Sequence, residues 1–186
     1  MRLIITRHGE TISNKKKILQ GHLDVELSNI GFLQAKKLAQ RLKDEKIDVV
    51  YSSDLIRAVD TSQEILKYHP RIELICDSRI RERFMGSAQG KSYVDFDWVN
   101  TPDDFEKNDD FKNRVYGFLL DITKKYTDET ILIVCHAGTK NMFFNIIKDI
   151  TSDNYTELKN TSVSEFELNN EGKFDVKYIN CSKHLN

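Results

Sequence analysis

The sequence has no long apolar segment, and this absence excludes several kinds of protein. The first apolar run, Leu3–Ile5, is too short for the hydrophobic part of a secretion signal. No other run approaches the roughly 20 residues that cross a membrane as a helix. We therefore expect a cytoplasmic protein that does not enter a membrane.

Paired cysteines, histidine pairs and an excess of one charge are also lacking. The three cysteines, Cys76, Cys135 and Cys181, are an odd number without metal-binding spacing, so we interpret them as reduced thiols. The five histidines form no H-x-x-x-H pair, and we expect neither a metal nor a cofactor. The formal net charge of −1 supplies no basic field for nucleic acid, which leaves a small molecule as the expected partner.

The sequence does contain an alternation of strand and helix patterns, which we assign to a single domain over residues 1–186. Strands are predicted at 1–6, 49–52, 72–76 and 131–134, with a closing hairpin of 163–168 and 174–179. Amphipathic helices are predicted at 28–43, 58–66, 111–122 and 138–147. This order predicts an α/β fold with a mostly parallel central sheet and helices on both faces, a three-layer α/β/α sandwich.

One segment, residues 92–110, fits neither pattern. It contains Pro102 and two pairs of aspartates, and we expect it to cover a site as a small lid. Its aromatic residues Tyr93, Phe96 and Trp98 are interpreted as packing within this lid rather than as a platform for a cofactor.

The motif Arg7-His8-Gly9-Glu10-Thr11 follows directly after the first predicted strand. It resembles the R-H-G-E-T signature of the histidine phosphatase superfamily, also called the phosphoglycerate mutase-like family. The family's remaining site residues recur in order as Asn14, Gln20-Gly21, Arg57, Glu82 and His136. The resemblance extends from Met1 to about Leu168 and implies the phosphoglycerate mutase-like form of the three-layer fold.

The resemblance assigns a role to each of these residues, and the chemistry of phosphoryl transfer explains the residue types. A phosphoryl group needs guanidinium groups to hold its charged oxygens and a nucleophile that can itself become phosphorylated. His8 is implied as that nucleophile, while Arg7, Arg57 and His136 bind the oxygens. Glu82 is implied as the proton donor and acceptor. Considered without the other motifs, Glu82 lies between two arginines in the sequence and could simply form ion pairs with them.

Four further positions complete the implied phosphate site. Asn14 and Gln20-Gly21 correspond to a loop that contacts phosphate or substrate. His136 and Ala137 lie in the corner that leads into the helix predicted at 138–147, and the backbone N–H groups at the start of this helix can point at an anion. Both Arg57 and His136 follow predicted strand ends, where ligands of open α/β sheets gather.

The resemblance leaves two reactions open within the same chemistry, hydrolysis and transfer. Gln89, in the stretch from Glu82 to Gly90, resembles the mutases of the family, whereas many of its phosphatases carry glutamate there. The chain lacks the paired arginines and proline-rich insertion with which the mutases enclose phosphoglycerate. We therefore predict a metal-independent phosphatase of small phosphorylated metabolites, with a cofactor-dependent phosphoglycerate mutase as the alternative.

Two other classes of protein are less compatible with these residues. Cys135 could suggest a tyrosine-phosphatase-like thiolate, but that loop needs an arginine six residues later, where Asn141 stands. A non-catalytic module that only binds phosphate is conceivable, yet no catalytic position of the family is missing. The identity of the substrate and the oligomeric state are left open.

Two groups of residues match no position of the family. Lys15, Lys16 and Lys17 could form a solvated turn, or one of them could reach a second anionic group of the substrate. His22, His69 and His184 are expected to be partly exposed surface residues.

Overall fold

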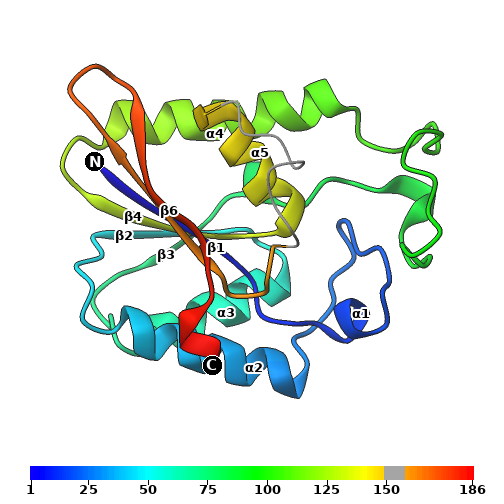
Figure 1. Cartoon of the computed structure of the whole chain (residues 1–186), viewed down its shortest axis with the longest axis horizontal. Helices are drawn as coiled ribbons and strands as arrows, with labels where there is room; N and C mark the ends of the chain where they lie inside the picture. The colour runs from blue at the N-terminus through cyan, green and yellow to red at the C-terminus, as the bar shows by residue number, and fades with distance from the viewer. Residues whose placement is uncertain (149–157) are drawn as a thin grey trace.

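A computed structural model describes residues 1–148 and 158–186 of the chain. Its centre is a six-stranded sheet with the strand order β3-β2-β4-β1-β5-β6 (Figure 1). In chain order the strands are β1 (Arg2–Arg7), β2 (Val49–Ser52), β3 (Leu74–Cys76), β4 (Thr130–Cys135), β5 (Val163–Leu168) and β6 (Phe174–Cys181).

The four strands β3, β2, β4 and β1 run parallel, whereas β5 pairs antiparallel with both β1 and β6. Arg7, the last residue of β1, pairs with Cys135, the last residue of β4. Ser52, the last residue of β2, pairs with Val134. The carboxyl ends of β1, β4 and β2 therefore meet at one edge of the sheet, where residues that follow these strands come together.

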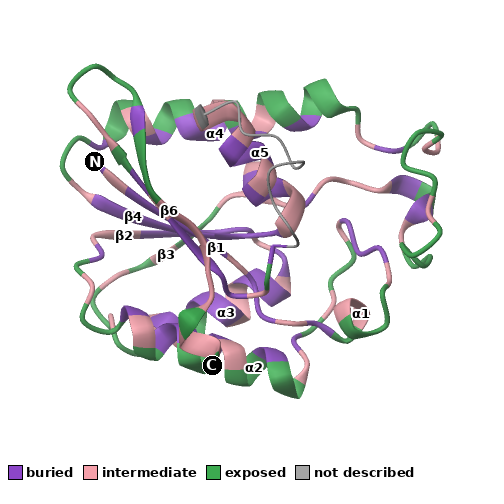
Figure 2. Cartoon of the chain, in the orientation of Figure 1, coloured by how far each residue is buried: buried purple, intermediate pink, exposed green. Residues whose placement is uncertain are grey.

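Helices cover both faces of the sheet, and each face has its own hydrophobic core (Figures 1 and 2). Along the buried strand β4, Ile131 and Ile133 face the α4 and α5 side, while Leu132 and Val134 face the α2 and α3 side. This alternation follows from the two-residue period of a strand that is buried on both faces. The helices are α1 (Ile12–Lys15), α2 (Asn29–Leu42), α3 (Ile56–Leu66), α4 (Asn108–Lys125) and α5 (Ala137–Lys148).

The α/β sandwich, the mostly parallel sheet and the closing hairpin are confirmed. The β3 strand is shorter than predicted, since the chain still turns at Ile72 and pairs with β2 only from Leu74. The irregular segment predicted at 92–110 also ends earlier, because α4 begins at Asn108 and takes up Asp109 and Asp110 in its first turn. Acidic side chains stabilise the positive N-terminal end of a helix, so these aspartates favour the helix over the loop.

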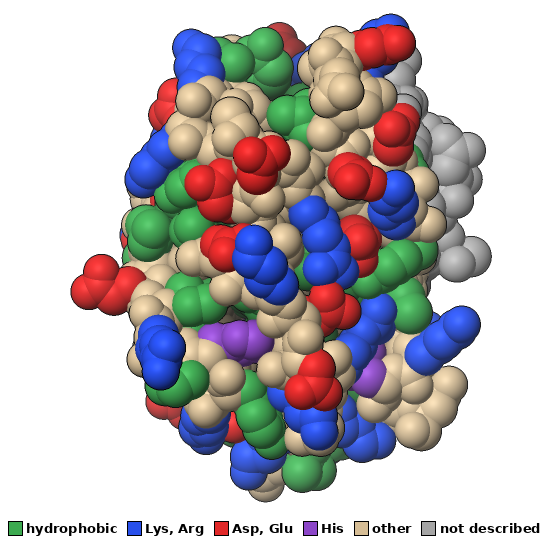
Figure 3. Space-filling model, turned by 90° about the vertical axis from the view of Figure 1, so that its left-hand side faces the viewer, with side chains coloured by type: hydrophobic (Ala, Val, Ile, Leu, Met, Phe, Trp, Pro, Cys, Tyr) green, Lys and Arg blue, Asp and Glu red, His purple; other side chains and the backbone are tan. Residues whose placement is uncertain are grey.

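The molecular surface carries both signs of charge. On the face seen in Figure 3, Lys and Arg side chains are interspersed with Asp and Glu, in keeping with the net charge of −1. Within residues 1–148 and 158–186, no helix is long and apolar enough to cross a membrane.

Candidate active site

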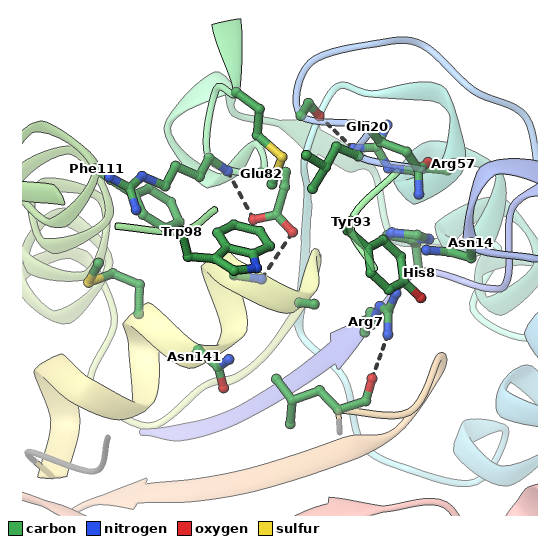
Figure 4. Close-up of a pocket in the computed structure, with 18 of the residues that line it drawn as sticks. Arg7, His8, Asn14, Gln20, Arg57, Glu82, Tyr93, Trp98, Phe111 and Asn141 are labelled. Carbon is green, nitrogen blue, oxygen red and sulfur yellow. Dashed lines mark hydrogen bonds between the residues drawn. The ribbon is translucent and has the colours of Figure 1, made fainter. Parts of the chain in front are cut away.

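A cleft of about 670 Å³ opens at the carboxyl ends of the central strands (Figure 4). Its lining includes eight of the nine residues that the resemblance singled out: Arg7, His8, Asn14, Gln20, Gly21, Arg57, Glu82 and Ala137. The ninth, His136, is fully buried, and its ring centroid lies 5.1 Å from that of His8.

His8 directly follows β1 and is held by both its backbone and its ring. Its backbone N–H donates to Cys135 O of the neighbouring strand at 3.0 Å. Its Nδ1 lies 2.6 Å from Gly9 O. Since a carbonyl oxygen can only accept, Nδ1 must carry the hydrogen, and Nε2 of the neutral ring keeps its lone pair. The lone pair that a nucleophile needs is therefore on Nε2.

The surroundings of His8 favour this neutral form. Burial of the ring, and then the positive charges of Arg57 and Arg7, hold the pKa of His8 well below its ordinary value. The loop after His8 is packed too closely for larger residues: a Cβ on Gly9 would overlap Gly31 O, and Gly9 N–H donates to Thr61 Oγ1 at 3.0 Å. Gly9 thus allows the close approach of α2 that supports the loop.

Arg57, at the start of α3, is almost fully buried and anchors the phosphate side of the cleft. Its two Nη atoms donate to Leu23 O and Gly21 O at 2.7 and 2.8 Å. Its Nε–H donates to His136 Nδ1 at 3.1 Å, so Nε2 of a neutral His136 carries the hydrogen. Burial, followed by the charge of Arg57, lowers the pKa of His136 well below its ordinary value, which keeps this ring neutral. Burial also lowers the pKa of Arg57 itself to about 10.

His136 Nε2 is buried and has no hydrogen-bond partner within the described residues. A buried N–H donor without a partner costs free energy, and an anionic oxygen bound beside His8 would supply one. Arg7 contributes from the other side of His8, where one of its Nη atoms donates to Leu158 O (Figure 4).

The loop after the motif points two side-chain amides toward the cleft. Thr11 O–H lies 3.0 Å from both Asn14 Oδ1 and Gln20 Oε1. Because these contacts use the amide oxygens, the N–H groups of both side chains are left to donate to a ligand. Gly21 has a φ of +50°, and a Cβ there would overlap Gln89 Oε1, so glycine is required at this turn.

Glu82 faces His8 across the cleft with both carboxylate oxygens in use. Oε1 accepts from Arg83 N–H at 2.9 Å, and Oε2 accepts from Gly138 N–H at 3.0 Å. A Cβ on Gly138 would overlap Glu82 Oε1, so only glycine lets the carboxylate approach the first turn of α5. Glu82 is thus held by two backbone N–H groups and forms no ion pair with its neighbouring arginines, contrary to the plain ion-pair interpretation.

Three residues that support the site were not predicted from the sequence. His22 Nε2 lies 2.8 Å from Glu82 O, and Arg114 Nη2 donates to the same carbonyl at 2.8 Å. Asn160 Nδ2 donates to His8 O at 2.9 Å. All three hold backbone oxygens of catalytic candidates over long sequence separations, and no local sequence pattern marks such contacts.

Other candidates of the sequence analysis do not contribute side chains to the cleft. Lys15, Lys16 and Lys17 are exposed and lie outside its lining, which favours the solvated turn. Gln89 also lies outside the lining, and its Oε1 accepts from His22 N–H at 2.7 Å. Gln89, which the mutases of the family share, therefore supports the loop around Gly21.

Cys135 cannot act as a thiolate nucleophile. It is fully buried at the end of β4, and burial raises the pKa of its thiol to about 12. Within the described residues, no group of three or more His, Cys, Asp or Glu side chains could hold a metal ion.

Comparison with known proteins agrees with this geometry. The sequence pattern of the histidine phosphatase superfamily (branch 1) matches residues 3–182. The chain is 33% identical to phosphoglycerate mutase-like protein 4 of Arabidopsis thaliana, over 98% of this chain and 86% of that protein. It is also 33% identical to a broad-specificity phosphatase of Saccharomyces cerevisiae, over 100% of this chain and 87% of that protein.

Among solved structures, a phosphoserine phosphatase mutant of Entamoeba histolytica in complex with phosphoserine superposes with a TM-score of 0.86. The identity is 26%, over 99% of this chain and 98% of that one. The match over residues 3–182 and the identity to the two relatives show that the chain belongs to the histidine phosphatase superfamily.

Proposed function

We propose that this chain hydrolyses phosphomonoesters of small metabolites through a phosphohistidine formed on His8. Phosphatase activity is what the family and the phosphatases among its relatives support. One observation carries the assignment to His8: the 2.6 Å contact of Nδ1 with Gly9 O, which leaves a lone pair on Nε2 beside two arginines.

In the first step, His8 Nε2 attacks phosphorus and forms an N–P bond while the bond from phosphorus to the leaving oxygen breaks. In the second step, water attacks the phosphohistidine, and the N–P bond breaks to release inorganic phosphate. The same imidazole is then free for the next cycle, and neither step needs a metal ion.

The phosphate oxygens are held by groups on three sides in this proposal. Arg7 and Arg57 supply positive charge, and His136 supplies the Nε2–H donor that lacks a partner in the described residues. Asn14 and Gln20 add amide N–H groups, and Ala137 lies at the first turn of α5, where backbone N–H groups point outward. These donors are fixed before substrate arrives, which is the arrangement that stabilises charge in a transition state.

Glu82 is proposed to move the protons. As a carboxylic acid it gives a proton to the leaving oxygen, and as a carboxylate it takes one from the attacking water. Its two backbone hydrogen bonds, to Arg83 N–H and Gly138 N–H, fix the carboxyl group at the cleft.

Hydrolysis is favoured over transfer because few cations line the part of the cleft beyond the phosphate. Apart from Arg7 and Arg57, Arg83 is the only arginine or lysine in the lining formed by the described residues. A mutase must hold a doubly phosphorylated intermediate in two orientations, which a single additional cation supports poorly. We propose that water outcompetes an alcohol for the phosphohistidine.

Two further features belong to this proposal. The irregular segment 92–107 is proposed as the lid, because Tyr93 and Trp98 from this segment line the cleft. A cytoplasmic location is supported by the three free thiols, of which Cys76 is exposed.

The experiment that tests the function measures phosphate release from p-nitrophenyl phosphate in the presence of EDTA. We expect activity that vanadate inhibits, that iodoacetamide does not abolish, and that disappears in His8→Ala. A requirement for a divalent metal, or loss of activity on alkylation alone, would contradict the proposed chemistry. A protein that binds phosphate without releasing it from esters would be a binding module.

A further inference from the structure

A row of aromatic side chains connects the lid to the wall of the cleft. The Arg83 guanidinium lies over the Phe105 ring at 4.7 Å, and Phe105 stacks on Phe96 with a ring distance of 6.1 Å. Phe96 in turn packs against Trp98 at 4.9 Å in a T-shaped arrangement. Phe105 is buried in a small core with Leu19. Both ends of this row, Arg83 and Trp98, line the cleft.

Trp98 remains 54% exposed although the aromatic row holds it in place. A large apolar side chain that lines a cleft and stays exposed is typical of a surface that a ligand covers. In the view of Figure 4 its indole lies between Phe111 and His8. Trp98 thus packs on Phe96 as the sequence predicted, and in addition it lines the cleft, as Tyr93 does.

The lining beyond the phosphate groups is rich in neutral amides. Asn141 and Asn145 on α5 are spaced four and eight residues from Ala137, so all three share one face of the helix, which lines the cleft. Asn108 adds a third amide from the start of α4. Asn141 Oδ1 is buried and has no partner within the described residues. A side-chain amide both donates and accepts, as a hydroxyl group does.

The cleft has room for a leaving group larger than a three-carbon acid. Phosphoserine has about eleven non-hydrogen atoms. If each atom takes up roughly the 30 Å³ of one water molecule, phosphoserine would occupy about half of the cleft volume. The cleft of about 670 Å³ lies within the range of sites that enclose drug-sized ligands.

We infer that Trp98 is the platform on which the ring of a sugar phosphate stacks, with Asn108, Asn141 and Asn145 around its hydroxyl groups. The C–H face of a sugar ring is apolar and weakly positive, which suits the negative face of the indole. A purely aromatic leaving group would cover the three amides without giving them partners, and that costs free energy. This inference rests on the proposed phosphatase function and names the substrate class of the same site.

The kinetic test compares glucose 6-phosphate with phosphoserine, which has no ring. Trp98→Ala is expected to lower kcat/KM for glucose 6-phosphate about ten-fold and to change that for phosphoserine less than two-fold. Trp98→Phe should retain most of the activity on the sugar phosphate. Val99→Ala is the matched control, because Val99 is next in the chain, 89% exposed and outside the lining.

A second variant separates a sugar from an aromatic leaving group. Asn141→Ala should lower kcat/KM for glucose 6-phosphate several-fold and leave p-nitrophenyl phosphate nearly unchanged. Equal losses on both substrates, or no loss on either, would contradict the assignment of the amides to hydroxyl groups.

Fluorescence provides a direct measurement of stacking, since Trp98 is the single tryptophan of the chain. In His8→Ala, which cannot turn over substrate, glucose 6-phosphate should change the tryptophan emission in a saturable way, whereas inorganic phosphate should not. Equal responses to both ligands, or none to the sugar phosphate, would overturn the inference. Activity on p-nitrophenyl phosphate that depends on His8 would leave the proposed function standing in that case.

Discussion

The backbone N–H of Gly138 donates to Glu82 Oε2 at 3.0 Å, and a Cβ on Gly138 would overlap the other oxygen of the same carboxylate. Gly138→Ala should therefore displace Glu82 and lower kcat for alkyl phosphates by about ten-fold or more, as expected when a positioned acid is moved. The loss should be smaller for p-nitrophenyl phosphate, whose leaving group needs no proton.

Gly117→Ala is the matched control for this variant. Gly117 lies in α4 with nothing within 4 Å of an added Cβ, so its replacement should leave activity unchanged. It should stabilise the protein by about 0.5–1 kcal/mol, because alanine favours a helix interior over glycine. Equal activity of the two alanine variants on alkyl phosphates would contradict the role given to Gly138.

Glu82→Gln tests the proton transfer itself. We expect a loss of about a hundred-fold on alkyl phosphates and a much smaller loss on p-nitrophenyl phosphate, because only the poor leaving group needs an acid. The glutamine NH₂ group would face a backbone N–H, so inhibition by inorganic phosphate should be measured as a check that the site stays intact. Equal losses on both substrates would remove Glu82 from the role of the acid.

The sequence predicts which residues gather at the cleft, but not which groups hold them in place. The strand, the motif at His8 and the order of Arg57, Glu82 and His136 are local patterns, and parallel strands bring their carboxyl ends together. The parallel strands are confirmed, and the structure brings His8, Arg57 and Glu82 to one cleft at their carboxyl ends.

The hydrogen bonds that support His8 and Glu82 could not be predicted, because each joins a side chain to a backbone oxygen that is distant in the sequence. Asn160 reaches the carbonyl of His8 across 152 residues, and His22 reaches that of Glu82 across 60. His22 was interpreted only as a partly exposed surface residue. It is partly exposed, but its role depends on a loop geometry that Gly21 and Gln89 create together.

Gln89→Glu tests whether this residue selects between a phosphatase and a mutase. Its Oε1 accepts from His22 N–H outside the cleft lining, and a glutamate oxygen can accept the same hydrogen bond. We expect phosphate release from phosphoglycerate to exceed isomerisation in both proteins, with the ratio changed less than two-fold. Isomerisation that outpaces hydrolysis, especially when bisphosphoglycerate stimulates it, would favour the mutase.

Lys140 predicts a pH dependence of stability. Its Nζ is fully buried and donates to Ser162 O at 2.7 Å and Ser162 Oγ at 2.9 Å. Burial lowers the pKa of Lys140 to about 7, whereas the unfolded chain keeps the ordinary value near 10.4. At a pH between these two pKa values, Lys140 is protonated in the unfolded state but largely deprotonated in the folded state. The free energy of unfolding therefore rises with pH in this range.

The predicted contribution of Lys140 is an increase of about 1 kcal/mol between pH 7 and 8. Lys140→Met should remove this increase from urea unfolding curves, while Lys36→Met, an exposed residue of α2, should keep it. A pH dependence that is unchanged in Lys140→Met would show that the lysine stays charged in the folded protein.

A covalent phosphate on His8 is the intermediate of the proposed reaction, and rapid-quench labelling with a ³²P-labelled phosphomonoester measures it directly. We predict a label that survives alkali, is lost in acid and maps to the peptide containing His8, with no label and no turnover in His8→Ala. A label on Cys135, or turnover that persists in His8→Ala, would rule out a phosphohistidine on His8 as the intermediate.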